Sequence, residues 1–126
     1  MSFESALVEE FLALPDIGMK LFPLAAPEGT KAPYVVYGAS PGLLVSTLSG
    51  YGSNKSLTVD INVVSSTYAG MKQHSEAVLA LLIGFQARAI GEDGLFIQQL
   101  ILEEPDEVYD DDTRLHKCVF SFTVHI

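Results

Sequence analysis

Two short pairs of residues have types that can carry nucleophilic chemistry or bind a metal. The first pair is His116 and Cys118, two positions apart in an alternating segment and therefore on one face of a predicted strand. Such a pair can act as base and nucleophile or supply two ligands to zinc. A closed zinc site needs four ligands, and the sequence adds only His74 and His125, with no second cysteine. Because phenylalanines occupy the next positions on that face, we expect Cys118 to be a small apolar residue of the core.

The second pair is His74 and Ser75, near the start of a predicted helix and on its apolar side. Neither residue lies in a Gly-x-Ser-x-Gly turn, so we expect polar groups at the rim of a core and not a hydrolytic pair. The glycines at 50 and 52 lack the third glycine and the following helix of a phosphate-binding loop. The sequence therefore predicts no catalytic residue, no cofactor and no metal site, and a protein that is not an enzyme.

Acidic residues crowd the segment before the last predicted strand. Their spacing does not match the EF-hand calcium loop, and a glycosidase cleft is not expected because the chain has no tryptophan platform. A solvated loop is the simplest interpretation of such a run, and an interaction surface facing a lumen or a partner is the alternative. The residues concerned are Glu103, Glu104, Asp106, Glu107, Asp110, Asp111 and Asp112.

Composition limits the classes of function further. The chain of 126 residues is predicted to be one domain over residues 1–126. Its 16 acidic and 7 basic residues give a net charge of −9, which argues against a protein that binds duplex DNA through phosphates. The N-terminus lacks the basic region of a signal peptide, and no apolar run approaches the roughly 20 residues that span a membrane. We therefore expect no membrane partner.

The elements that would position these residues are clearest in 56–85, where a strand runs into a helix. Apolar residues alternate with polar ones from Leu57 to Val63, which is the period of a half-buried strand. The period then becomes helical, with Met71, Val78 and Leu82 on one face, and Ser66 or Thr67 can cap the helix. Elsewhere the pattern predicts a helix over 3–14, strands over 19–22, 34–39, 95–102 and 115–126, and an acidic connection over 103–113.

Residues 40–55 are unusual because apolar side chains stand among turn residues. One interpretation is a long β-arm whose apolar side chains pack on a neighbouring subunit, and the other is a loop folded back on its own sheet. The apolar residues are Leu43, Leu44, Val45, Leu48 and Tyr51. Together the elements predict an α+β fold, with a mainly antiparallel sheet of about five strands, two helices packed on one face and a long β-arm or loop.

With its elements in this order, nearly the whole chain resembles the tail-completion, or tail-terminator, proteins of long-tailed bacteriophages and prophage-derived particles. The resemblance lies in the N-terminal helix FESALVEEFLAL, the segment KLFPLAAPEGTKAPYVVYGAS, the strand–helix unit LTVDINVVSSTYAGMKQHSEAVLALL and the closing segment LFIQQLILEEPDEVYDDDTRLHKCVFSFTVHI. No catalytic motif belongs to this pattern. The paired glutamines at 98 and 99 depart from it.

The resemblance implies a structural virion protein, made in the host bacterial cytoplasm and located at the neck end of the tail. It implies a homo-hexameric ring that caps the tail tube, ends its polymerisation and joins it to the head. The implied partners are the tail-tube protein and a head-completion or neck protein, with DNA passing through the ring unbound. A head-completion or stopper protein of the same neck region is one alternative. A small-ligand-binding or hydrolytic α+β domain is the other.

Overall fold

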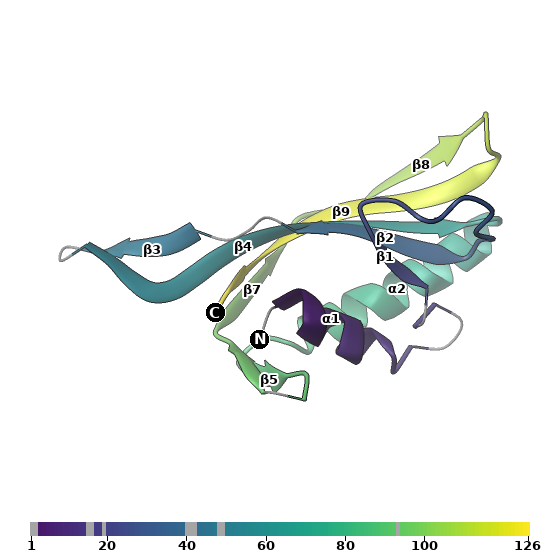
Figure 1. The fold of residues 1–126 in the computed structure, drawn as a ribbon. Coiled ribbons are helices and arrows are strands. Elements are labelled where there is room, and N and C mark those ends of the chain that lie inside the picture. Colours follow the sequence, from purple (N-terminus) through teal and green to yellow (C-terminus); the bar gives the residue numbers. More distant parts are fainter. Residues whose placement is uncertain (1–2, 15–16, 19, 40–42, 48–49, 93) are drawn as a thin grey trace.

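A sheet with both helices on one face forms the framework of the molecule (Figure 1). The computed structural model describes residues 3–14, 17–18, 20–39, 43–47, 50–92 and 94–126, and in 43–47 and 50–55 it describes the backbone alone. The two helices are α1 (Phe3–Phe11) and α2 (Tyr68–Ile83). No helix in the described ranges is long and apolar enough to cross a membrane.

The main sheet has seven strands, and its central path runs β1-β2-β4-β9-β7. Strand β3 pairs with the N-terminal part of β4. Strand β8 pairs with the N-terminal part of β9, and β7 pairs with its C-terminal part. Only the β1–β2 pair is parallel among these pairings. The strands are β1 (Leu21–Pro23), β2 (Tyr34–Ala39), β3 (Leu43–Thr47), β4 (Gly50–Ser65), β7 (Gln99–Leu102), β8 (Asp106–Asp110) and β9 (Leu115–His125). Two further strands, β5 (Arg88–Ile90) and β6 (Leu95–Ile97), form a small antiparallel sheet of their own.

Strands β4 and β9 form the centre of the sheet and pair over ten residues of each, from Ser56 opposite His125 to Ser65 opposite His116. Alternate residues of both strands face the helices, because side chains alternate between the two faces of a strand. The result is a continuous apolar layer, in which Ile61 lies opposite Phe120 and both side chains are buried. This is the alternation that the sequence predicts for both segments.

The helices complete the core by burying one face each. Helix α2 buries Met71, Val78 and Leu82, and Phe3 of α1 meets Phe122 of β9 edge to face, with ring centroids 6.2 Å apart. Thr67 caps α2, since its hydroxyl accepts a hydrogen bond of 3.0 Å from the Gly70 amide.

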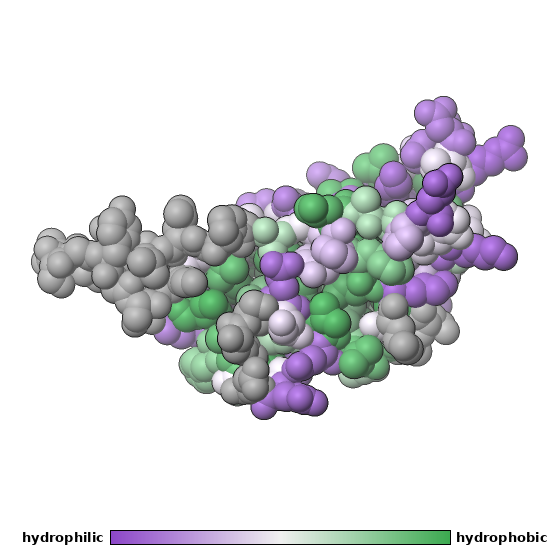
Figure 2. All heavy atoms as spheres, viewed as in Figure 1, coloured by the Kyte–Doolittle hydropathy of each residue, from purple (hydrophilic) through white to green (hydrophobic). Residues whose placement is uncertain are grey.

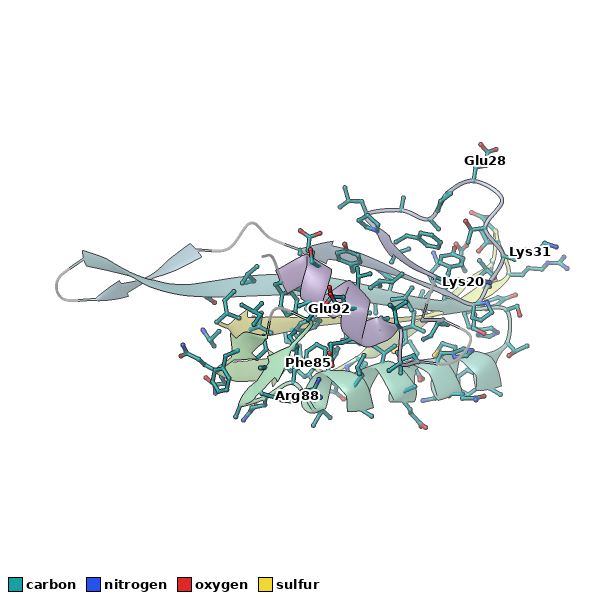
Figure 3. All side chains as sticks on the ribbon, turned by 60° about the horizontal axis from the view of Figure 1, so that its bottom comes forward. Lys20, Glu28, Lys31, Phe85, Arg88 and Glu92 are labelled. Carbon is teal, nitrogen blue, oxygen red and sulfur yellow. The ribbon has the colours of Figure 1, made fainter. Side chains whose placement is uncertain are left out.

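Helix α1 is fixed to the turn between β5 and β6 by two carboxylates. Glu9 accepts a hydrogen bond of 2.6 Å from the Glu92 amide. Glu10 accepts one of 3.2 Å from the Gly91 amide and forms an ion pair with Arg88. Figure 3 shows Glu92 beside α1, with Arg88 and Phe85 near the end of α2. The small sheet therefore joins the ends of the two helices.

The predicted α+β class, with helices on one face, is confirmed, although the sheet has more strands than the five expected. The first helix ends at Phe11 and not at 14, because its last turn tightens into hydrogen bonds between residues three apart, such as Leu14 to Phe11. The second helix spans Tyr68–Ile83, and Thr67 is the capping residue. The first strand covers Leu21–Pro23 in place of 19–22.

Two predictions for the last third of the chain are wrong. The single strand expected over 95–102 is two strands in different sheets. Gln98 and Gln99 are both exposed between buried Ile97 and Leu100, so the alternation shifts by one residue at this point. The connection expected over 103–113 contains β8, whose residues pair with Leu115–Val119 of β9.

Candidate assembly surfaces

Two extensions leave the body of the molecule in opposite directions (Figure 1). One is a hairpin of β3 and the first residues of β4, here called the arm (43–47 and 50–55). The other is the β8–β9 hairpin. In the arm, Leu44 pairs with Lys55 and Thr47 with Gly50, with a shift of register between Leu44 and Ser46. The backbone therefore agrees with the β-arm interpretation of this segment and not with a loop folded on the sheet.

The apolar residues predicted for an interface belong to this arm. Leu43, Leu44 and Val45 lie in β3, and Tyr51 lies at the start of β4. Their side chains, and Leu48 as a whole, lie outside what the structure describes. Whether they form an interface therefore stays a prediction at this point.

The β8–β9 hairpin carries most of the predicted acidic residues, and Figure 2 shows hydrophilic side chains gathered over this end of the molecule. Glu103 and Glu104 precede β8, Asp106, Glu107 and Asp110 lie in it, and Asp111 and Asp112 form the turn to β9. All are exposed except Asp110, which is half-buried.

Asp110 organises the turn of this hairpin. Its carboxylate accepts a hydrogen bond of 3.0 Å from the Asp112 amide and lies 3.5 Å from the Lys117 ammonium. The hydrogen bond from the Asp112 backbone, followed by one from the Thr113 hydroxyl, lowers the pKa of Asp110. The Asp110 carboxylate therefore stays charged to a lower pH than an ordinary aspartate does.

An open groove lies between α2 and β8. It consists of two hollows that adjoin at Glu107, which lines both. The first hollow, of about 300 Å³, is lined by Tyr68, Met71, Glu107, Val108, Tyr109 and His116. Its aromatic rings contact one another: the Tyr109 and His116 centroids lie 4.8 Å apart, and the Tyr68 and His116 centroids 6.0 Å apart. This part of the groove is an exposed aromatic surface.

The second hollow, of about 350 Å³, is mainly acidic at its rim. It is lined by Lys72, Ser75, Glu76, Leu79, Glu104, Pro105, Asp106, Glu107 and Cys118. An ion pair between Lys72 and Glu107 links α2 to β8. The hydrogen bond with Glu107 raises the pKa of Lys72, so the ammonium stays charged to a higher pH than that of an ordinary lysine.

The two candidate catalytic pairs are not arranged for catalysis. Cys118 is buried and its thiol pKa is raised by burial, while the His116 ring packs between two tyrosines. Ser75 is buried and donates a hydrogen bond of 3.1 Å to the Lys72 carbonyl. His74 precedes Ser75 on the helix, and neighbouring helical side chains do not face each other. Within the described part of the chain, no group of three His, Cys, Asp or Glu side chains is placed to hold a metal.

The aromatic part of the groove was not predicted from the sequence. A signal was present, since Val108 and Tyr109 are an apolar pair inside an acidic segment, which a fully solvated connection does not need. The sequence did not reveal that Tyr109 pairs with His116 of β9. This pairing brings the two rings beside Tyr68 of α2.

Comparison with known proteins identifies relatives of the chain. A family model described as tail completion protein gp17 matches residues 6–126. A chain in the virion of a native gene transfer agent particle has the same fold, with a TM-score of 0.65 and 15% identity over 98% of this chain and 93% of that chain. A second solved structure gives a TM-score of 0.58, also at 15% identity, over 98% of this chain and 90% of that one. No curated protein matches in sequence.

Proposed function

Because the chain belongs to the family of tail completion protein gp17, we propose that six copies form a ring on the end of a phage-type tail tube. A tail-completion protein is a structural component of the virion, and this one ends tube polymerisation and offers the surface that joins tail to head. Its partners are the tail-tube protein below and a head-completion or neck protein above.

The main support for a ring is that the two extensions lie at opposite ends of the molecule (Figure 1). A closed ring is built from head-to-tail contacts, in which two different surfaces of each subunit meet. A subunit with a projecting arm at one end and a hollowed surface at the other has two such surfaces. The apolar residues of the arm sequence are then covered by a neighbour.

The acidic charge suits a conduit for DNA. With a net charge of −9, a ring of these subunits repels the phosphate backbone and does not hold it. The acidic residues of the β8–β9 hairpin that do not line the groove, Asp110, Asp111 and Asp112, contribute to this property if they face the lumen. If they face outward, they offer a docking surface to a basic neck protein.

The test is negative-stain microscopy of the purified protein mixed with assembled tail tubes and free tube subunits. We expect ring-shaped density at one end of each tube and no further elongation at that end. A variant lacking 48–55 serves as the control: it should fold, as judged by circular dichroism, but leave tubes uncapped. Tubes that elongate normally with the intact protein, or binding only to head-side neck proteins, would overturn the proposal in favour of a stopper protein.

A further inference from the structure

We propose that the groove between α2 and β8 of one subunit receives the arm of the next subunit around the ring. This inference rests on the proposed function and names the surface by which the ring closes. The occupant is therefore a second copy of this chain, and its arm is a segment of known sequence.

The groove has the chemistry of a protein interface. Tyr68, Val108 and Tyr109 are among the large hydrophobic residues that remain exposed, at 52%, 49% and 49%. All three line the same hollow, where the His116 ring meets Tyr68 edge to face and Tyr109 at a tilt. Exposed apolar residues that gather in one place mark interaction sites, and tyrosine is enriched at the centre of interfaces.

The charge of the groove is complementary to that of the arm. Four carboxylates line the second hollow, from Glu76, Glu104, Asp106 and Glu107, and Glu107 is paired with the one lysine there, Lys72. The arm sequence from 43 to 56 contains no acidic residue, and its one charged residue is Lys55. A segment that combines five large apolar residues with a single positive charge fits a groove that is aromatic in one half and acidic in the other.

The topology places arm and groove at the two ends of the same strand. Strand β4 begins in the arm at Gly50 and ends at Ser65, which pairs with His116 in the wall of the groove. Its 16 residues span roughly 50 Å at about 3.3 Å per residue. If rotation about the ring axis places the next subunit along this direction, the arm of one copy reaches the groove of the next. Six such contacts close the ring and leave no arm and no groove without a neighbour.

Two edge-strand substitutions test the groove against a matched control. Val108 in β8 and Ile101 in β7 are 49% and 48% exposed, and both strands pair with β9. At one fixed protein concentration, Val108→Asp should reduce the number of capped tube ends at least tenfold, because it places a charge in the apolar half of the groove. Ile101→Asp should cap as the wild type does, and both variants should unfold at the same urea concentration.

Photo-crosslinking identifies the occupant. The protein carries p-benzoylphenylalanine in place of Tyr51, is bound to tail tubes and is irradiated. We expect a covalent dimer whose linked peptide contains residues 68–79 or 104–109. Capping with crosslinks to another part of the neighbour, capping without any subunit crosslink, or equal capping by Val108→Asp and Ile101→Asp would each overturn the groove assignment and leave the ring intact. Failure of the wild-type protein to cap tubes would instead overturn the proposed function.

Discussion

Cys118 illustrates how burial decides the chemistry of a single residue. Its side chain is 2% exposed, and burial raises the pKa of its thiol even though a hydrogen bond with Ser75 acts in the opposite direction. The thiolate is the reactive form, so at pH 8 the native protein should react with a thiol reagent far more slowly than the same protein in denaturant. Labelling of the native protein at the rate of a free cysteine would place the thiol in solvent and contradict its assignment to the core.

A neighbouring pair on α2 tests which helix face is buried. Leu82 is 0% exposed, whereas the adjacent Ile83 is 62% exposed. Leu82→Ala should lower the free energy of unfolding by about 2–5 kcal/mol, because it removes buried methyl groups and leaves a cavity. Ile83→Ala should change it by no more than about 0.5 kcal/mol, as measured by urea denaturation. Equal effects at the two positions would mean that the helix is rotated from the orientation described.

At the scale of elements, the contact between α1 and the β5–β6 turn depends on a glycine. Gly91 has φ +74°, and a Cβ there would lie 2.8 Å from Glu9 Oε2 and 3.0 Å from the Ala6 Cβ. Gly94 in the same turn has φ +70°, but the nearest atom to an added Cβ is 4.0 Å away. Both alanine variants carry the cost of a left-handed backbone, roughly 1–2 kcal/mol. Only Gly91→Ala also pushes against α1.

We therefore expect Gly91→Ala to destabilise the protein more than Gly94→Ala does, by about 1 kcal/mol or more, since overpacking typically costs about 1–3 kcal/mol. Urea denaturation of the two variants and the wild type gives the difference directly. If both variants lost the same stability, α1 would not be packed against this turn.

The elements that sequence predicted well are those whose pattern is local and long. The alternation from Leu57 to Val63 and the helical face containing Met71 and Val78 both appear as expected. The sequence pattern did not predict β8, because its acidic residues have low strand propensity and the strand is formed by pairing with β9. It also failed for β5, a three-residue strand supported by pairing with β6 and by the ion pair of Arg88 with Glu10. The groove depends on the pairing of β8 with β9, so the sequence pattern did not predict it either.

At the scale of the whole molecule, charge determines how the protein meets nucleic acid. With 7 basic against 16 acidic residues, few phosphates can be neutralised at once and few counterions released. Even in the β1–β2 region, where Lys20 and Lys31 lie near each other, Glu28 belongs to the same loop (Figure 3). A gel-shift assay with duplex DNA at physiological salt should show no complex. Micromolar binding with a steep salt dependence would contradict the role of a passive conduit.

The position of β9 in the sheet has a consequence for biosynthesis. It is the last strand in the sequence, yet it lies at the centre of the sheet, with β4 on one side and both β7 and β8 on the other. A nascent chain can form α2 and the β2–β4 pair early, but the groove has neither its His116 wall nor a paired β8 until β9 has left the ribosome. The groove that we propose as the acceptor of a neighbour's arm is therefore complete only once β9 has been translated, whereas the arm itself, at 43–47 and 50–55, leaves the ribosome much earlier.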